Sequence, residues 1–359
     1  MNMEDNQHVL VRGVRIPIIR GRLDLSSIGI ESTSDLDGIA KVADLRELII
    51  PRWFEGDIGP ITRLTNLRVL VLKGAPIKTI LDLSQLTNLE ELSVRACFGI
   101  KSLEGVENLI NLKKLDLSST RIQSMKGLET LTRLQELRLD HVGRDVDVPG
   151  YPGFKRESIT RIEGLEHLHD LRVLSLASNT IERIEGLDGL ARLEVLNLQM
   201  NKIRKIEGLD HLANLKELYL AHNQIERIEG LDACQRLEKL SLSGNPIKRM
   251  EGLDALSNLD ELTISSNKLQ RIEGLAHLSK LRVLAIGDGL VTLEGLEHNV
   301  NLEELYLQGN KFTSLDGLLH LKRLKKLSID RNRFPKTELA KLRQLPSLVD
   351  VNTFDPDDA

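Results

Sequence analysis

The segment LKELYLAHNQIERIEGLDACQR, residues 215–236, is one copy of a repeat that occupies most of the chain. Its opening pattern is LxxLx(L/I)xx, usually followed by Asn, and copies begin 22 residues apart in the central part of the sequence. A fixed period of this length is typical of solenoid proteins, in which each repeat packs only against its neighbours. A degenerate copy around residues 23–30 comes first and brings the total to about fourteen. The regular copies start at Leu45, Leu67, Leu89, Leu112, Leu134, Leu171, Leu193, Leu215, Leu237, Leu259, Leu281, Leu302 and Leu324.

The apolar positions of each repeat predict its local structure. Leu at the fourth position and Leu or Ile at the sixth alternate with polar residues, which predicts a short strand with one buried face. The apolar residues of the recurring segment RIEGL then predict turns that return the chain through the core. Stacked repeats should therefore form a continuous parallel sheet on one side and short turns on the other.

Asparagine occupies the ninth position in most repeats of the C-terminal part. A side-chain amide at this place can bond the turn backbone of its own repeat and of the neighbouring one, so we expect a structural role. The asparagines are Asn179, Asn201, Asn223, Asn245, Asn267, Asn310 and Asn332. We expect this ladder to be weaker in the earlier repeats, where the ninth residues are Ala75, Cys97, Thr120 and Val142.

The repeat resembles the short, 22-residue class of leucine-rich repeats, which is used by a regulatory subunit of protein phosphatase-1 and by bacterial internalin-type adhesins. The tail NRFPKTELAKLRQLPSLVDVNTF, residues 332–354, also resembles the C-terminal cap of the phosphatase-regulator family and favours the intracellular branch. The resemblance implies an α/β solenoid, specifically a right-handed leucine-rich repeat horseshoe with a parallel concave sheet and short 3-10 or turn segments on its convex side.

The same reading divides the chain into three parts. Residues 1–22 are predicted to form an N-terminal cap, 23–334 the solenoid, and 335–359 a C-terminal cap. The spacing from Leu134 to Leu171 is 37 residues, so an insertion lies near 142–158. This insertion contains Tyr151 and Phe154, two large side chains that the repeat core does not require. It is either a neutral surface loop or a loop that binds a partner at one rim of the sheet.

The concave face is the main candidate for binding. From the repeat at Leu45 to the repeat at Leu324, its outward positions carry nine acidic and six basic residues, a mixture that fits a protein partner better than a nucleic-acid backbone. Tyr219 and Tyr306 share the fifth position and would offer large contact areas. The phosphatase-regulator resemblance implies a binding role for Glu304 and Tyr306 as an acidic and aromatic pair. We predict a partner-binding set of Asp116, Arg138, Asp140, Tyr151, Phe154, Asn197, Tyr219, Glu304 and Tyr306.

Composition excludes several other classes of protein. Lys and Arg total 49 against 53 Asp and Glu, so no strong positive charge favours nucleic acid or an anionic membrane surface. The beginning of the chain does not resemble a secretion signal, and no apolar run is long enough to cross a bilayer. We expect a monomeric cytoplasmic protein, with the nucleus as the alternative location if the protein is eukaryotic.

Histidine is the only serious candidate for enzymatic or metal chemistry. The imidazoles of His277, His298 and His320 fall at equivalent places in consecutive repeats, but no cysteine or carboxylate partner belongs to the pattern. We therefore predict no catalytic residues, no metal site and no cofactor.

The preferred function is a protein-interaction scaffold that binds a protein on its concave face, with a phosphatase catalytic subunit as the partner that the resemblance implies. The first alternative is an internalin-like secreted or surface adhesin. The second is a metal-binding or enzymatic protein that uses the histidine column.

Overall fold

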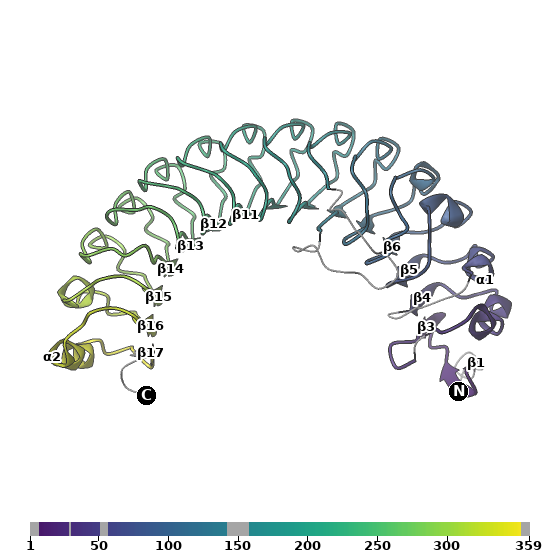
Figure 1. The fold of residues 1–359 in the computed structure, drawn as a ribbon, viewed down its shortest axis with the longest axis horizontal. Coiled ribbons are helices and arrows are strands. Elements are labelled where there is room, and N and C mark those ends of the chain that lie inside the picture. Colours follow the sequence, from purple (N-terminus) through teal and green to yellow (C-terminus); the bar gives the residue numbers. More distant parts are fainter. Residues whose placement is uncertain (1–6, 29, 51–56, 142–157, 353–359) are drawn as a thin grey trace. The chain divides into compact units, whose positions relative to one another are not determined.

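A computed structural model of the chain describes residues 7–28, 30–50, 57–141 and 158–352 (Figure 1). The chain divides into two compact units, Met1–Thr180 and Ile181–Ala359. The insertion residues Tyr151 and Phe154 lie outside the described residues. Within those residues, no helix has the length and apolar character needed to cross a bilayer.

The first unit contains an antiparallel hairpin of β1 (His8–Val11) and β2 (Val14–Pro17), followed by parallel strands in chain order. The described parallel strands are β3 (Arg22–Asp24), β4 (Glu47–Ile50), β5 (Val69–Leu72), β6 (Glu91–Ser93), β7 (Lys114–Asp116), β8 (Glu136–Arg138) and β9 (Val173–Ser175). Short helices occupy several of the returning segments: η2 (Thr33–Leu36), η3 (Ile39–Lys41), α1 (Gly59–Thr62), η4 (Ile80–Leu83) and η5 (Val106–Asn108).

The second unit continues the same pattern. Its described strands are β10 (Val195–Asn197), β11 (Glu217–Tyr219), β12 (Lys239–Ser241), β13 (Glu261–Thr263), β14 (Val283–Ala285), β15 (Glu304–Tyr306), β16 (Lys326–Ser328) and β17 (Asp350–Asn352). Its described helices are η6 (Asp316–Leu318), α2 (Lys336–Leu339) and η7 (Ala340–Gln344). Within each unit the strands line the inner side of the curve, and the turns and short helices line the outer side (Figure 1). The predicted parallel solenoid is confirmed.

The repeat at 215–236 shows how the sequence pattern forms the core. Leu215, Leu218 and Leu220 are fully buried, while Glu217 and Tyr219 between them are only partly buried. Each buried leucine side chain contributes about 1.5–3 kcal/mol through removal of apolar surface from water. Because the repeats contribute such leucines at equivalent positions, the core continues from one repeat to the next.

The asparagine ladder is confirmed in detail. The Asn223 side-chain nitrogen donates to the carbonyl oxygens of Leu220, in its own repeat, and of Leu198, in the preceding one, each at 3.0 Å. Its Oδ1 accepts the backbone N–H of Ile203 at 3.0 Å. One buried amide therefore bonds three backbone groups of two repeats, and Asn201 and Asn245 donate to the same carbonyls of Leu198 and Leu220, so that the ladder is continuous.

The glycine of the IEGL turn has a steric cause. Gly230 has a φ of 68°, and a Cβ there would lie 2.5 Å from the carbonyl oxygen of Ile206 in the preceding repeat. A larger residue would therefore meet both backbone strain and a clash. The turn can pack this closely only because its third residue has no side chain.

The C-terminal end contains a strand that the sequence analysis did not predict. After α2 and η7, strand β17 pairs in parallel with β16, and Leu327 lies opposite Val351. Lys341 Nζ also contacts Asp316 Oδ1 and Glu338 Oε1, each at 2.7 Å, which fastens the helical segment to the preceding repeat. The last full repeat therefore has a hydrogen-bonded neighbour along its sheet edge.

Candidate protein-interaction surface

The fifth positions of the repeats form one row across the sheet of the second unit. Parallel pairing places each of these residues directly beside its equivalent in the next strand, because neighbouring strands are registered one full repeat apart. The row consists of Asn197, Tyr219, Ser241, Thr263, Ala285, Tyr306 and Ser328, and Asn352 of the terminal strand β17 continues it. The two tyrosines are thus separated by three small side chains.

Both tyrosines are held by a glutamate of their own strand. The Tyr219 hydroxyl donates to Glu217 Oε2 at 2.6 Å, and the Tyr306 hydroxyl donates to Glu304 Oε2 at 2.7 Å. The rings are partly buried, whereas the sequence analysis expected them to be exposed. Each ring therefore presents an apolar face in a fixed orientation, which lowers the entropy that a binding partner must remove.

The acidity of the two phenols follows from these contacts. Partial burial, followed by the hydrogen bond to Glu217, raises the pKa of Tyr219 above that of an ordinary tyrosine. The hydrogen bond to Glu304, followed by partial burial, raises the pKa of Tyr306 in the same way. Both hydroxyls therefore stay protonated at neutral pH and remain hydrogen-bond donors.

The glutamates of these pairs also bridge to the next strand. Lys239 Nζ lies 3.6 Å from Glu217 Oε1, and Lys326 Nζ donates to Glu304 Oε1 at 2.9 Å. The Lys326 hydrogen bond, followed by the one from Tyr306, lowers the pKa of Glu304. Because these groups are largely solvated, their main effect is to fix side-chain positions, since exposed ion pairs contribute less than about 1 kcal/mol.

In the first unit, two of the predicted residues line a shallow hollow of about 360 Å³ on the sheet face. Asp116 and Arg138 line this hollow with Lys73, Arg95 and Glu136, among others. Arg138 Nε donates to Glu136 Oε1 at 2.6 Å. Burial opposes the charge of Arg138, but this hydrogen bond and the nearby carboxylates outweigh it, so the pKa of Arg138 is raised. The guanidinium therefore keeps its positive charge at any accessible pH.

Asp140 has a structural task that the sequence analysis did not foresee. Its Oδ1 accepts hydrogen bonds from the Ser175 hydroxyl at 2.6 Å and the Ala177 backbone N–H at 2.7 Å. These bonds join two strands that the insertion separates in the sequence. A contribution of Asp140 to binding stays a prediction, and so do the binding roles of the other predicted residues.

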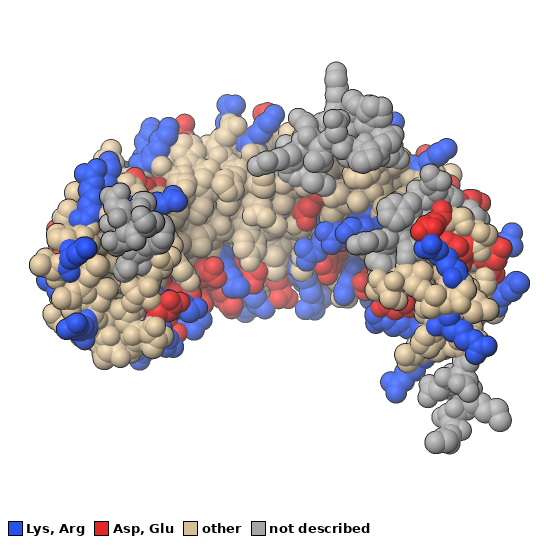
Figure 2. Space-filling model, turned by 60° about the horizontal axis from the view of Figure 1, so that its bottom comes forward, with Lys and Arg blue, Asp and Glu red and all other residues tan. Residues whose placement is uncertain are grey.

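The structure thus arranges the described members of that set in three groups. Asp116 and Arg138 are paired on the neighbouring strands β7 and β8 of the first unit, and Asp140 follows β8. Asn197 and Tyr219 lie side by side in the second unit. Glu304 and Tyr306 both belong to β15, towards the C-terminal end of that unit. Across the face in view in Figure 2, Lys and Arg side chains are interspersed with Asp and Glu.

The opposite face carries an ion-pair ladder between successive turns. Arg227 lies 3.6 Å from Glu251, and Arg249 lies 3.2 Å from Glu273. The basic residue of one RIEGL or RMEGL turn therefore pairs with the glutamate of the next. Hydrogen bonds from Arg271 and Arg249 outweigh a desolvation effect and lower the pKa of Glu273. This pattern fits a solvated charge ladder.

Two histidines of the predicted column have polar neighbours of their own. His277 Nε2 lies 3.9 Å from Asp254 Oδ1, and His320 Nε2 lies 3.0 Å from the carbonyl oxygen of Leu296. Across residues 7–28, 30–50, 57–141 and 158–352, no three His, Cys, Asp or Glu side chains are grouped so as to hold a metal ion. The two cysteines are buried, and burial raises the pKa of Cys97 to about 12 and that of Cys234 to about 11.

A second asparagine ladder, which the sequence analysis missed, runs along the side where the strands begin. Asn66, Asn88 and Asn111 each donate from the side-chain nitrogen to a backbone carbonyl of the preceding repeat, at 2.8–3.0 Å. Asn214, Asn258 and Asn301 do the same in the second unit. The sequence signal was present, because an Asn directly precedes the first Leu in each of these repeats.

The comparison with known families decides the identity of the repeat. Residues 169–211, 213–255 and 300–347 match the family described as "Leucine Rich repeats (2 copies)". The matched segments are leucine-rich repeats, and the fold is a leucine-rich repeat solenoid. No curated protein sequence gives a significant match.

Several solved leucine-rich repeat structures are similar in fold. An internalin of Listeria monocytogenes, InlF, superposes with a TM-score of 0.70 and 23% identity, and 82% of each chain is covered. The functional domain of InlJ from the same bacterium gives 0.66 and 24%, over 87% of this chain but only 63% of that one. A leucine-rich repeat protein of Leptospira interrogans gives 0.58 and 22%, over 91% of this chain and 94% of that one. At these identities the likeness concerns the fold.

Proposed function

We propose that this protein is a binding scaffold that receives a protein partner on the sheet face of its second unit. The observation that carries the proposal is the repeated arrangement of Glu217 with Tyr219 and of Glu304 with Tyr306. Two tethered aromatic rings with small side chains between them offer two anchor points on a regular surface. Tyrosine is enriched among the residues that dominate binding energy at interfaces.

Two more specific forms of this proposal differ in the partner that they name. An internalin-like adhesin is supported by the likeness in fold to the Listeria internalins. A phosphatase catalytic subunit as partner rests only on the resemblance of Glu304 and Tyr306 to that family's pair, and the comparisons give it no support. The cytoplasmic location that accompanies the second version stays a prediction.

Site-specific photo-crosslinking tests the common part of the proposal. A benzophenone amino acid placed at Ser241, between the two tyrosines, should capture a protein partner in cells of the native host. The same group at Lys248, an exposed residue on the turn side, is the matched control and should capture far less of it. Labelling of intact cells with an impermeant reagent would then separate a surface adhesin from an intracellular protein.

The partner identified in this way allows a quantitative test. Tyr219→Ala and Tyr306→Ala should each weaken its binding about tenfold or more, because each removes an anchoring ring. Tyr219→Phe keeps the ring and should cost less, while Arg227→Ala on the opposite face should have little effect. If Arg227→Ala abolished binding and both tyrosine variants bound normally, the concave-face proposal would be wrong.

A further inference from the structure

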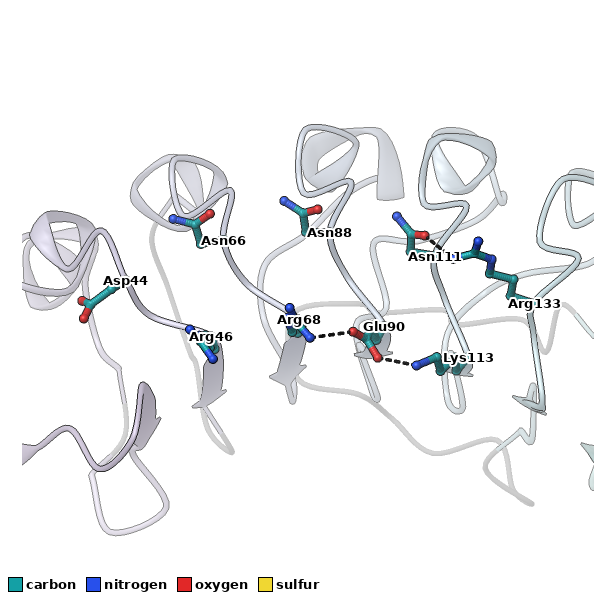
Figure 3. A pocket seen from close by; sticks show the side chains of 9 residues that line it. All are labelled: Asp44, Arg46, Asn66, Arg68, Asn88, Glu90, Asn111, Lys113 and Arg133. Atoms are coloured by element: carbon teal, nitrogen blue, oxygen red, sulfur yellow. Dashed lines mark hydrogen bonds and ion pairs between the residues drawn. The ribbon is translucent and has the colours of Figure 1, made fainter. Parts of the chain in front are cut away.

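The side of the first unit where the strands begin carries a hollow of about 480 Å³ with an excess of basic side chains. Its lining includes Arg46, Arg68, Lys113 and Arg133 against the acids Asp44 and Glu90 (Figure 3). We call this hollow the strand-entry groove. It is separate from the sheet face of the proposed function, because Arg46, Arg68, Glu90 and Lys113 each stand one residue before a strand.

The charges in this groove are incompletely compensated. Glu90 is shared between two bases, since its carboxylate lies 3.2 Å from Arg68 and 2.6 Å from Lys113. Both contacts, led by the hydrogen bond from Lys113, lower the pKa of Glu90, which stays ionised. The side chain of Arg46 is exposed and makes no ion pair with any residue that the structure describes. Among the described residues, Arg133 bonds to a neutral group alone, the Asn111 Oδ1 at 2.9 Å.

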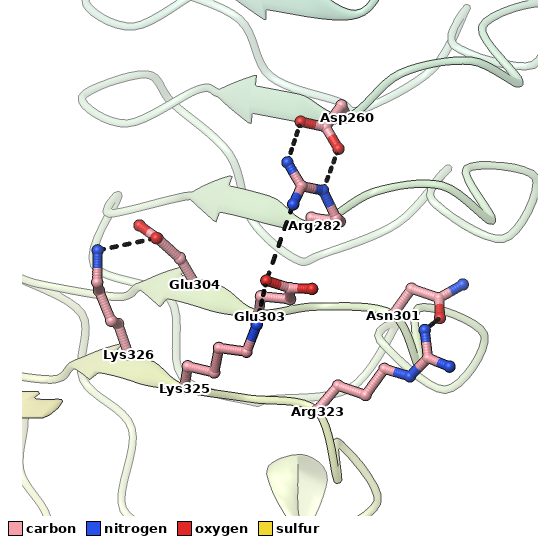
Figure 4. Close-up of polar contacts among 8 residues, drawn as sticks. All are labelled: Asp260, Arg282, Asn301, Glu303, Glu304, Arg323, Lys325 and Lys326. Carbon is pink, nitrogen blue, oxygen red and sulfur yellow. Dashed lines mark hydrogen bonds and ion pairs between the residues drawn. The ribbon is translucent and has the colours of Figure 1, made fainter. Parts of the chain in front are cut away.

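The equivalent row of the second unit shows what a compensated arrangement looks like. Arg282 makes two hydrogen bonds with Asp260, at 2.5 and 3.0 Å, and its third nitrogen lies 3.8 Å from Glu303 (Figure 4). Glu303 in turn accepts from Lys325 at 2.8 Å. The residues that precede strands β10 to β16 are Glu194, Lys216, Glu238, Asp260, Arg282, Glu303 and Lys325. Acids therefore outnumber bases in that row, whereas bases outnumber acids in the first unit.

Repeat geometry determines which ligand would fit the groove. Neighbouring strands lie about 4.8 Å apart, so Arg46 and Lys113, three strands apart, are separated by about 14 Å. An extended peptide covers this distance with about four or five residues. We infer that the strand-entry groove binds an extended acidic segment of a partner protein, whose carboxylates pair with Arg46, Arg68 and Arg133.

The probe for this inference is a fluorescein-labelled peptide of about eight residues in which Glu alternates with Gly, long enough to span the groove. Fluorescence anisotropy should show binding to the full chain that weakens as salt is raised, because screening reduces attraction between exposed charges. A peptide with Gln in place of Glu should bind at least about tenfold more weakly. Equal binding of the two peptides would overturn the inference.

Two matched double variants locate the site. Arg46→Glu with Arg133→Glu should weaken the acidic peptide about tenfold. Lys216→Glu with Arg323→Glu alters the same repeat positions of the second unit, where Arg323 bonds Asn301 as Arg133 bonds Asn111, and should change affinity less than about twofold. If both double variants weakened binding equally, the peptide would be responding to general charge and the inference would be wrong.

Three further measurements complete the test. Arg46→Gln alone should weaken peptide binding about threefold without disturbing the fold. This single variant remains informative if the double variant proves to be less stable. The double variant Tyr219→Ala with Tyr306→Ala should leave peptide binding unchanged. The proposal for this groove is thereby tested independently of the proposed sheet-face site. An oligothymidylate that displaced the peptide at a lower concentration than unlabelled peptide does would assign the groove to nucleic acid and overturn the inference.

Discussion

The ninth position of the repeat is filled differently in two regions of the chain. From residue 67 to 141, within the first unit, the described ninth residues are Ala75, Cys97 and Thr120, all buried. Of these, Thr120 donates to the carbonyl of Leu117 at 2.7 Å, a bond within its own repeat. In the second unit, asparagines join most repeats to the preceding one.

The comparison shows that one fold is held by two kinds of turn. Where the asparagines are absent, the returning segments more often contain short helices such as η4 and η5, whose backbone groups bond locally. Where the asparagines are present, the returning segments are mostly turns, and side-chain amides satisfy the backbone. Both solutions leave the leucine core unchanged.

The largest effect should come from the core that both regions share. Leu220→Ala in the second unit and Leu117→Ala in the first remove equivalent buried leucines and should each cost about 2–5 kcal/mol in the free energy of unfolding. Chemical denaturation measures both values. A cost below about 0.5 kcal/mol for either variant would mean that this side chain does not belong to the core.

The ninth position itself should separate the two regions. Asn223→Ala leaves the Ile203 N–H without its side-chain acceptor and removes one of two amide donors from each of the Leu198 and Leu220 carbonyls, and should destabilise the protein by about 2–3 kcal/mol. Thr120→Ala removes one local hydrogen bond and should cost about 1 kcal/mol. Equal losses in denaturation experiments would show that the ladder adds nothing beyond filling space.

Replacement of an irregular core residue in the second unit should stabilise the protein. Asn299 occupies a core position that is leucine in most repeats, and its buried Oδ1 has no hydrogen-bond partner among the described residues. The carbonyls of Leu275 and Leu278, which accept from its amide, each also accept a backbone N–H. Asn299→Leu should therefore raise the free energy of unfolding by about 1–2 kcal/mol, and a loss of stability would show that the amide is required.

The smallest effect concerns the repeat with a 21-residue spacing, where Asp288 takes the place of a ladder asparagine. It accepts backbone N–H groups of Asn267 and Leu269, but burial outweighs these bonds and raises its pKa. The folded protein therefore binds a proton more readily than the unfolded chain, and this residue's contribution to stability is lost as pH rises from 3.8, its ordinary value, through the raised pKa.

Asp288→Asn removes this dependence and should raise stability by about 1 kcal/mol or less at neutral pH. The gain should shrink in acid, where the native carboxyl is protonated. Thermal melts of both proteins at pH 3 and pH 7 check this expectation. A gain that was larger in acid would contradict the assignment of Asp288 as the destabilised group.

Much of this architecture was readable because it is periodic. The starts at Leu193, Leu215 and Leu237 predicted strands that the structure places one repeat apart, and the alternation around them predicted which side chains are buried. The role of Asn223 followed from its position in a crowded turn. The 21-residue spacing from Leu281 to Leu302 also marks an irregular repeat, but the role of Asp288 in it was not predicted.

The side-chain contacts on the candidate surfaces could be predicted only in part from the sequence. The row that contains Tyr219 and Tyr306 was predicted, but the tethering of each hydroxyl to a glutamate two residues earlier was not. The excess charge at Arg46 and Arg133 was also missed, since its significance depends on which neighbouring groups are already paired. Strand β17 was missed because residues 350–352 lack the repeat pattern.

The amino-acid sequence by itself determined the repeat, the parallel sheet and the inward face of every regular strand, because these follow from the spacing of leucines along one chain. Only the tertiary structure decided which side chains of adjacent repeats meet. An ion pair or an unpaired arginine depends on distances of a few ångströms between residues about 22 positions apart, and such distances arise only when the repeats are stacked.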